Sequence, residues 1–444
     1  MTVSGRVPPA SERSIGLEFY VTTTPGAPAT LKRSADEFRV TEISNYPWPD
    51  AAGPFVVLRI ASRDWEQHEL GAALARRLGL APHAVAWSGT KDRRAVAERL
   101  LSYRGPLPDG DLGLPRVELL EAYRARDGLV LGHLYGNAFE VHVVPDGASP
   151  EAAHRRYDAT AVELRELGAV PNFFGPQRFG EVRPITHRVG RALVRGDPEG
   201  AVDAYLVERP DGTPDARGDS ARAAYAEHRD PSRALHEFPS DYRFERALLE
   251  RLARGQSATQ ALRGLSRELR LLFVHAFQAY LFNRWLSERW RAGGSLSVPL
   301  VGDRVLRIGR DGTVRAHEGI PVSDDNLAEC SDLVARGGAR VAGPLVGYET
   351  PVGEGPGEEV LARLLRAEGV TPAGFRLPFA PEISSKGAWR AIALDVPPIS
   401  VRPDALGVWF RFALPKGAYA TVVLREFLKV GSTDPPGRAS SNSY

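Results

Sequence analysis

The octapeptide Gly-Thr-Lys-Asp-Arg-Arg-Ala-Val, residues 89–96, places one carboxylate among three basic side chains. Because Lys91, Arg93 and Arg94 favour the charged form of a neighbouring carboxylate, we expect Asp92 to stay ionised at neutral pH. An ionised aspartate serves as a nucleophile, as a base or as a metal ligand. A turn aspartate with solvated basic neighbours would have no chemical role, and the octapeptide alone is compatible with both interpretations.

A second segment, PNFFGPQRFG at residues 171–180, combines aromatic faces with hydrogen-bond donors. Its glycines and prolines favour a loop, and aromatic faces together with donors are what holds an unstacked base and its phosphate. We expect Asn172 and Phe174 to contact a substrate and Arg178 to contribute a donor. Phe173 and Phe179 are assigned to the core.

Lysine is rare in this chain, since only Lys32, Lys91, Lys386, Lys416 and Lys429 are lysine among 57 basic residues. A surviving lysine marks a place where a compact ammonium is needed rather than a planar guanidinium, although chance explains any single one of them. Lys416 and Gly417 form a turn before an apolar helix. A basic turn at a helix start is suited to receive a phosphate, so Lys416 is a candidate substrate contact.

The elements that must position these residues follow from hydrophobic periodicity. A strand at 54–60, a helix at 66–79 and a short strand at 85–87 precede Asp92, which therefore lies at the end of a sheet strand, held at a cleft. Further expected elements are strands at 129–134 and 139–144, helices at 151–167 and 269–291, and a strand, turn and helix from 408 onward. Residues 208–234 are expected to be an exposed excursion rather than a core element.

Composition limits the class of protein. With 444 residues, 43% of them apolar and 25% charged, the chain is long enough for two domains of a globular protein. The first residues lack the apolar core of a signal peptide and no long apolar run follows, so the cytoplasm is expected, with neither export nor a membrane contact. One cysteine, Cys330, excludes an intrachain disulfide and any zinc site with several cysteine ligands. We found no metal-binding or nucleotide-binding signature either.

Seven segments in this order resemble the TruD family of tRNA pseudouridine synthases. They are SADEFRVTEI at 34–43, GTKDRRAV at 89–96, LGHLYGNAFEV at 131–141, PNFFGPQRFG at 171–180, FVHAFQAYLFN at 273–283, SSKGAWRAI at 384–392 and FALPKGAYATVVLREF at 412–427. A colinear match from residue 34 to residue 427 is far more specific than any one of these motifs.

The resemblance implies isomerisation of uridine to pseudouridine in tRNA, at uridine 13. It implies that Asp92 is catalytic, that Lys91 supports it, and that Phe38, Asn172, Phe174 and Phe412 have active-site roles. One carboxylate suffices for this reaction, because the detached uracil is rejoined through another atom and no water is added. The carboxylate could attack C1′ of the sugar, add to C6 of the base, or remove a sugar proton to give a glycal. No cofactor or metal is implied, and the sequence points to no protein partner.

The fold implied by the resemblance is α+β. A pseudouridine synthase core, with a mixed and largely antiparallel sheet and helices, is interrupted by an inserted α/β domain. The core would comprise residues 15–183 and 395–430, and the insertion residues 184–394. Residues 1–14 and 431–444, rich in Ser, Pro and Gly, are expected to be disordered.

Two residues of this chain depart from the pattern of the family. Where the family commonly continues K-D-R-x-A-V-T-x-Q, this chain has Ala97 and Arg99, which removes a hydroxyl and an amide behind the catalytic loop.

One alternative function is that of an RNA-binding or RNA-folding protein without catalysis, which would have the same segments. A nucleoside hydrolase is a further alternative, but the sequence has neither a paired carboxylate motif nor an acidic metal cluster.

Overall fold

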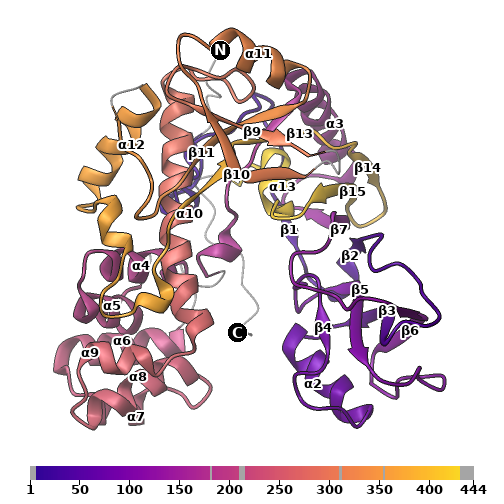
Figure 1. The fold of residues 1–444 in the computed structure, drawn as a ribbon, viewed down its shortest axis with the longest axis vertical. Helices are drawn as coiled ribbons and strands as arrows, with labels where there is room; N and C mark the ends of the chain where they lie inside the picture. The colour runs from indigo at the N-terminus through magenta and orange to yellow at the C-terminus, as the bar shows by residue number, and fades with distance from the viewer. Residues whose placement is uncertain (1–6, 181–182, 210–215, 310–312, 354–355, 431–444) are drawn as a thin grey trace. The chain divides into compact units, whose positions relative to one another are not determined.

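A computed structural model describes residues 7–180, 183–209, 216–309, 313–353 and 356–430 (Figure 1). The chain divides into two compact units. We call Thr24–Gly168 with Val396–Lys429 the sheet unit. Met1–Thr23, Ala169–Asp395 and Val430–Tyr444 form the helical unit.

The sheet unit is built on a mixed sheet with the strand order β14-β15-β7-β2-β5-β3-β6, in which β1 also pairs with β7 and β4 with β5. Its strands are β1 (Ala29–Leu31), β2 (Phe38–Ile43), β3 (Phe55–Arg63), β4 (Ala86–Trp87), β5 (Val96–Arg104), β6 (Val117–Ala125), β7 (Gly136–Pro145), β14 (Ser400–Pro403) and β15 (Val408–Pro415). Its helices are the 3-10 helix η1 (Ala35–Glu37) and the α-helices α2 (Gln67–Arg77), α3 (Pro150–Leu167) and α13 (Ala420–Leu428).

Strand pairing in this sheet is antiparallel except between β2 and β5, where Arg39 lies opposite Val96 in parallel register. The parallel pair needs a crossover, which is supplied by β3, α2 and β4. Alternating residues of β3, among them Val56, Leu58 and Ile60, are fully buried and pack against Leu70 and Leu74 of α2. Leu101 of β5 belongs to the same buried cluster and Trp87 of β4 packs against it, so the cluster holds the two strands that the Asp92 loop joins.

The helical unit contains the long helix α10 (Arg267–Arg291) and an antiparallel sheet with the order β10-β9-β11-β12. The remaining helices are α1 (Ala10–Arg13), η2 (Pro176–Arg178), α4 (Thr186–Val194), α5 (Pro198–Leu206), α6 (Ala216–His228), α7 (Pro231–Glu237), α8 (Arg243–Ala253), α9 (Ala258–Arg263), α11 (Leu327–Ala335), α12 (Pro356–Ala367), η3 (Pro372–Phe375) and η4 (Pro381–Ile383). The strands are β8 (Ala169–Pro171), β9 (Arg304–Ile308), β10 (Val314–Pro321), β11 (Ala339–Leu345), β12 (Ala388–Ala391) and β13 (Ala393–Asp395), and β8 pairs with β13.

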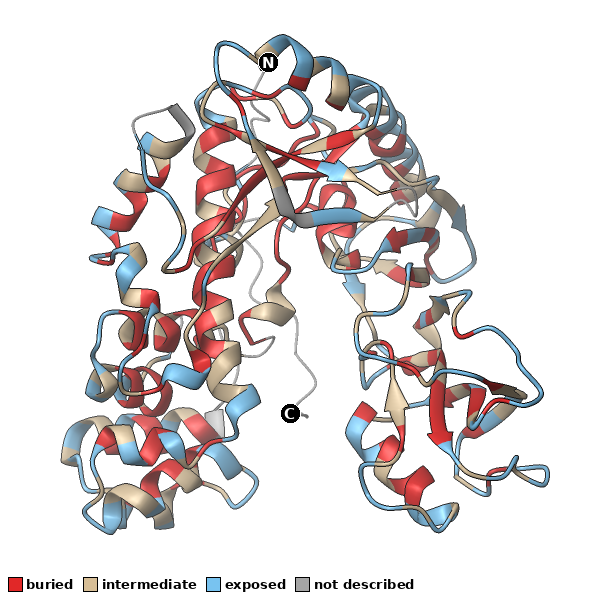
Figure 2. Cartoon of the chain, viewed as in Figure 1, coloured by how far each residue is buried: buried red, intermediate tan, exposed pale blue. Residues whose placement is uncertain are grey.

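Helix α10 is the central element of this unit, and Figure 2 shows it buried along much of its length. Phe273, Phe277, Leu281 and Trp285 recur at helical spacing and are at most 3% exposed. The helix begins at Ser266, whose hydroxyl accepts a hydrogen bond from the Leu269 N–H, as a helix N-cap does. The helix predicted over 269–291 is therefore confirmed.

The α+β class and the mixed, largely antiparallel sheet are confirmed, but two local predictions were wrong. Residues 129–134 form a loop rather than a strand, because Gly132 adopts φ +92 and its N–H binds the Ser88 carbonyl instead of a ladder partner. Within 208–234, helices α6 and α7 replace the predicted excursion. Tyr225 and Ala234 are buried there, and Arg222 pairs with Glu245 at 2.9 Å.

The predicted disorder of residues 1–14 was wrong for its described part. Ala10–Arg13 form helix α1, and Ile15 and Leu17 just beyond it are at most 2% exposed. Residues 1–6 and the predicted tail, 431–444, lie outside the described residues. The compact units divide after Gly168 and after Asp395, so residues 169–183 lie in the helical unit. Compact units are not family-defined domains, and the domain boundaries stay a prediction.

Candidate active site

Asp92 lies on the loop that joins β4 to β5, near the end of a strand as predicted. Its side chain is 38% exposed, which leaves the carboxylate open to a substrate. The Asp92 Oδ2 atom accepts a hydrogen bond from the Lys32 ammonium at 3.2 Å. The loop thus presents one accessible carboxylate with one cation beside it.

Lys32 is supplied by a distant part of the chain, just after β1. Its backbone is left-handed, with φ +53, a conformation that non-glycine residues rarely adopt. The Lys32 ammonium also lies 4.1 Å from the ring centroid of Phe38, at the start of β2. Contacts with an anion and an aromatic face fix the position of the ammonium, and through it that of the Asp92 carboxylate.

The Lys91 side chain points away from Asp92 and into the interior of the protein. Its ammonium lies 2.7 Å from Glu42 Oε2, and both side chains are only 2% exposed. The Ser88 hydroxyl donates to the other Glu42 oxygen. Burial lowers the pKa of Lys91, and the charge of Glu42 opposes this effect. Lys91 therefore anchors the Asp92 loop on its buried side, whereas Lys32 is the cation that contacts Asp92.

The two departures from the family pattern, Ala97 and Arg99, lie in the buried part of β5. Arg99 is 1% exposed, and its Nη1 donates to Gln67 Oε1 of α2 at 2.6 Å. Burial lowers the pKa of Arg99 to about 10, while the charges of Glu42 and Glu66 oppose the shift. The Arg99 guanidinium therefore provides a hydrogen bond behind the Asp92 loop. The sequence had predicted the loss of a hydroxyl and an amide at this place.

Phe38 and Phe412, both predicted site residues, belong to one aromatic row. The rings of Phe412 and Phe139 are stacked with centroids 5.6 Å apart, and Phe139 meets Phe38 edge-on at 6.2 Å. All three residues are at most 8% exposed. This row forms an apolar support beside the Lys32 ammonium.

Lys416 does not point to an open phosphate site, since its ammonium donates to the carbonyl of Gly132 at 2.9 Å. Its backbone N–H binds the carbonyl of Tyr135, also at 2.9 Å. Lys416 therefore holds the 129–135 loop, which runs beside the Asp92 loop.

Asn172, in the helical unit, is held by two partners. Its Nδ2 donates to the Ala391 carbonyl at 2.9 Å, and its Oδ1 accepts from Arg390 Nη2 at 2.6 Å. The Arg390 Nε donates to the Asn172 carbonyl at 3.0 Å. Arg390 thereby fixes both the side chain and the backbone of this residue.

Phe174 is 5% exposed and lies between charged and aromatic neighbours. The Arg390 guanidinium lies 4.1 Å from its ring centroid, Phe282 meets it edge-on at 5.6 Å, and Arg178 lies 5.6 Å away. Phe173 and Phe179 are at most 1% exposed, so their assignment to the core is confirmed. The predicted residues Asn172, Phe174 and Arg178 thus form one cluster in the helical unit.

The predicted residues consequently fall into two sets, one in each unit. The sheet unit brings together Asp92, Phe38 and Phe412. Lys91 lies on the buried side of the Asp92 loop, and Lys416 contacts the neighbouring 129–135 loop. Sequence reasoning missed Lys32, Glu42 and Arg390 as contributors. The scarcity of lysine is a signal that could have singled out Lys32. Glu42 and Arg390 lie in the matching segments 34–43 and 384–392, but nothing in those segments shows which residues they contact.

Exchange of Arg390 for lysine is expected to lower the free energy of unfolding by about 1–3 kcal/mol, because an ammonium cannot bind Asn172 at two points while covering Phe174. Urea denaturation of purified protein measures the change. Arg336→Lys is the matched control, since Arg336 is 80% exposed and makes one ion pair at 3.1 Å. A loss no larger than that of the control would contradict the role of Arg390.

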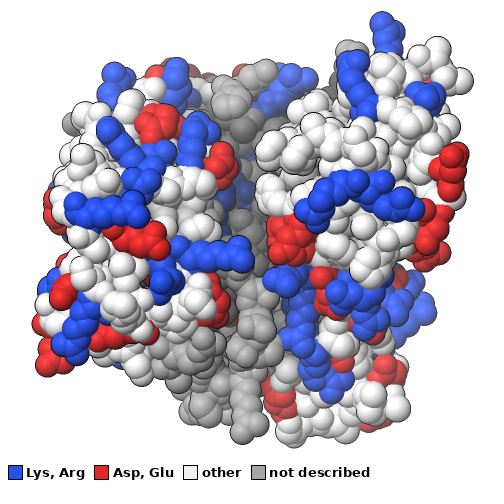
Figure 3. Space-filling view, turned by 90° about the horizontal axis from the view of Figure 1, so that it is seen from below, with Lys and Arg blue, Asp and Glu red and all other residues white. Residues whose placement is uncertain are grey.

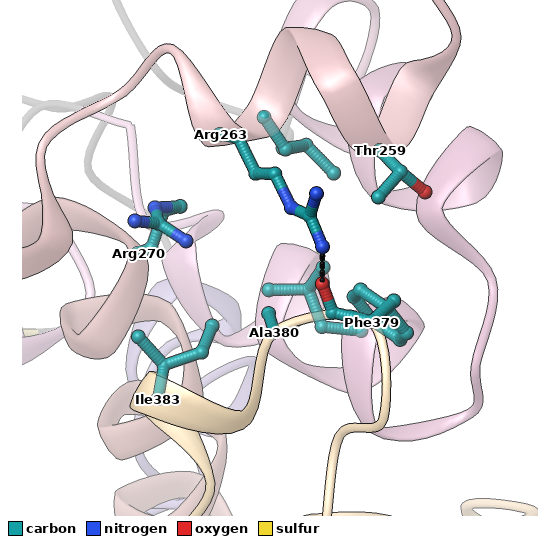
Figure 4. A pocket seen from close by; sticks show the side chains of 8 residues that line it. Thr259, Arg263, Arg270, Phe379, Ala380 and Ile383 are labelled. Carbon is teal, nitrogen blue, oxygen red and sulfur yellow. Dashed lines mark hydrogen bonds between the residues drawn. The ribbon is translucent and has the colours of Figure 1, made fainter.

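A small pocket in the helical unit is no part of either set (Figure 4). It holds about 10 Å³, room for about one water molecule. Arg263 donates to the Phe379 carbonyl at 2.7 Å, and Arg270 pairs with Glu382, so both cations have partners. Among the described residues, no cluster of His, Cys, Asp and Glu suited to a metal ion occurs. No described helix is long and apolar enough to cross a membrane.

Comparison with known proteins matches residues 14–427 to the family model described as tRNA pseudouridine synthase D (TruD). A Halobacterium salinarum protein named probable tRNA pseudouridine synthase D is 38% identical, with 94% of this chain and 97% of that protein covered. The Methanococcoides burtonii protein of that name is 34% identical, with 95% of this chain and 98% of that protein covered. A solved Methanosarcina mazei structure described as TruD superposes with a TM-score of 0.80 and 32% identity. The superposition covers 96% of this chain and 99% of that one.

The mixed sheet and the matches over nearly the whole chain define a pseudouridine synthase, an enzyme of the isomerase class. They confirm the resemblance found in the sequence. The chain belongs to the tRNA pseudouridine synthase D (TruD) family.

Proposed function

We propose that this protein converts uridine to pseudouridine in tRNA, at uridine 13, with Asp92 as its single catalytic carboxylate. The observation that supports this most directly is the accessible Asp92 carboxylate, ion-paired with Lys32 at 3.2 Å above a buried aromatic row. The names of the relatives supply tRNA as the substrate. A tRNA substrate favours the cytoplasm as the compartment.

In the proposed reaction the C1′–N1 bond of uridine breaks, the uracil turns, and a C1′–C5 bond forms. The proton on C5 leaves and N1 gains one, so no atom is added to the nucleoside. Asp92 would attack C1′, add to C6, or take a sugar proton, and each route uses one carboxylate. Lys32 would hold that carboxylate toward the uridine, while Lys91 and Glu42 keep the loop in place.

The distribution of charge limits where a polyanion could bind. Figure 3 shows Lys and Arg side chains spread over one face of the molecule among Asp and Glu. The net charge is only +2, so contacts with phosphate must come from local groups of basic residues. In the sheet unit, Phe38 and Phe412 are the proposed aromatic contacts for the target nucleotide, and Lys416, which also holds the Gly132 carbonyl, is the proposed polar one. In the helical unit, Phe174 is the proposed aromatic contact with the tRNA, and Asn172 and Arg178 are the proposed polar ones.

The direct test is incubation of the purified protein with a transcribed tRNA that carries uridine at position 13. Pseudouridine is then mapped by carbodiimide modification and primer extension. A new stop that reports position 13 is the expected result. Modification at another uridine would overturn the target, an unmodified tRNA would overturn the activity, and free uracil would indicate the hydrolase alternative.

Replacement of Lys32 by methionine is expected to lower kcat by about tenfold to a hundredfold with a smaller effect on KM. The reason is that the Asp92 carboxylate loses the partner that orients it. Single-turnover formation of pseudouridine measures the change. Lys32→Arg should restore part of the rate, because a guanidinium also donates to a carboxylate.

Lys386→Met is the matched control for this substitution, since Lys386 is 70% exposed and pairs with Glu349 at 3.4 Å. It removes the same charge from the chain at a residue of the helical unit. Equal rate losses in Lys32→Met and Lys386→Met would show that general charge, rather than the contact with Asp92, sets the rate.

A further inference from the structure

The 129–135 loop exposes large apolar side chains beside the Asp92 loop. Leu131 is 69% exposed, Val130 is 53% exposed and Tyr135 is 43% exposed. Single exposed apolar residues are ordinary on a protein surface. Several in one short loop indicate a contact with another molecule.

This loop is held rigidly against the Asp92 loop. The N–H of Gly132 donates to the Ser88 carbonyl at 2.7 Å, and Lys416 holds the carbonyl of Gly132 at 2.9 Å. The side chain of Leu134 packs against Gly89, where a Cβ atom would meet Leu134 Cδ1 at 3.4 Å. Leu131, next to the anchored Gly132, is therefore presented on a firm support at a fixed place relative to residues 88–92.

The surroundings of the loop favour RNA over a protein partner. Arg93, Arg94 and His133 are exposed on the two loops, and the exposed Lys416 reaches the 129–135 loop from the turn after β15, whereas Asp92 is the acidic residue of the two loops. Cations around an apolar tip suit a polyanion that offers flat apolar bases. Proteins that part stacked bases insert an apolar side chain between them, and an enzyme that acts on a stacked uridine must first extract it.

We propose that Leu131 is a wedge that enters the RNA stack next to the target uridine and occupies the space the extruded base leaves. The proposal rests on the proposed function, since it assigns a role in delivering uridine to Asp92. Val130 and Tyr135 flank the wedge and cover the neighbouring bases. The bound partner is structured RNA in which the target uridine is stacked.

The test compares Leu131→Ala with the wild type on two RNAs. One is a transcribed tRNA with uridine at position 13 and 2-aminopurine as its 3′ neighbour, and the other is a short single-stranded RNA with the same local sequence. Fluorescence of 2-aminopurine rises when its neighbour leaves the stack, so it reports extrusion without any need for catalysis. Formation of pseudouridine is followed in parallel.

We expect Leu131→Ala to lose most of the fluorescence rise at saturating tRNA. Its kcat/KM should fall by about tenfold or more on tRNA and much less on the single strand, where little stacking must be broken. Leu131→Phe should keep the rise, because a large apolar side chain is retained. Leu406→Ala is the matched control, since Leu406 is 68% exposed in the same unit and lies away from this loop, between β14 and β15.

An unchanged fluorescence rise in Leu131→Ala would overturn the wedge, and so would an equal rate loss on both RNAs. A rise that depends on Leu131 without any pseudouridine in the wild type would support the wedge and overturn the proposed activity. The two proposals therefore fail separately. Because Leu131 is exposed, its truncation leaves the core intact, and a thermal melt verifies that the variant is folded.

Discussion

Asp92→Asn is expected to abolish formation of pseudouridine, with a fall in kcat of at least about a thousandfold, while the protein stays folded and binds tRNA. Asparagine has the shape of aspartate, and its carbonyl still accepts a hydrogen bond from Lys32. It offers no negative charge and no nucleophilic carboxylate. Because the Asp92 side chain is 38% exposed and its partner Lys32 is 17% exposed, loss of this ion pair should change stability by no more than about 1 kcal/mol.

Asp36→Asn provides the matched control for this prediction. Asp36 is 49% exposed and pairs with Arg63 at 2.6 Å in the same unit. Its replacement should leave the rate within about twofold of the wild type. Full complementation of a gene deletion by Asp92→Asn would instead indicate an RNA-binding protein whose role needs no catalysis.

Glu42→Gln is expected to lower the free energy of unfolding by about 3–5 kcal/mol. Lys91, whose side chain is 2% exposed, then keeps its buried charge without a carboxylate partner, and the Ser88 hydroxyl loses its charged acceptor. Arg99, whose buried charge Glu42 also compensates, adds to the loss. Urea denaturation measures the effect, and the rate should fall with it because the loop that carries Asp92 loses its anchor.

The pH dependence of the variant tests the same mechanism. Burial lowers the pKa of Lys91 below its ordinary 10.5, and Glu42 opposes this shift. Without Glu42 the pKa of folded Lys91 falls further below that of the unfolded chain. The unfolded chain then binds more protons in the window between these two values, so stability of Glu42→Gln should rise with pH across it and level off near 10.5.

The double variant Glu42→Gln/Lys91→Met supplies the control, because it removes both buried charges. Replacing a buried ion pair with uncharged groups is often close to neutral, so the double variant should recover much of the lost stability. It should also lose the part of the rise with pH that Lys91 causes, while the part due to Arg99, which also lacks Glu42, remains. A double variant as unstable as Glu42→Gln would mean that the pair does not act through charge compensation.

The loop that carries Asp92 was predictable from the sequence because its signal is local. A short strand, a glycine turn and a carboxylate among cations follow one another within residues 85–96, and the structure places Asp92 near that strand end. The partner of Asp92 was not predictable in this way. Lys32 is 60 residues away, and only the pairing of β1 with β7 and of β2 with its neighbours brings it there.

The same distinction between local and distant contacts explains what else the sequence did not reveal. Lys91 is adjacent to Asp92 in sequence, but its ammonium binds Glu42, whereas the Asp92 carboxylate binds Lys32. Arg390 acts on Asn172 across 218 residues. Residues 129–134 have the apolar content of a strand, yet their exposed side chains and left-handed Gly132 belong to a loop.

The pairing of β15 with β7 has a consequence for biosynthesis. Val408 to Pro415 lie opposite Val143 to Gly136, so the sheet that carries Asp92 is completed only by the last strand of the chain. A ribosome needs on the order of tens of seconds to translate the residues between these two strands. During that interval the nascent chain exposes the edge of β7, and the enzyme cannot modify any RNA until the late strand has emerged. Chaperone protection of that edge during translation would therefore raise the yield of active protein.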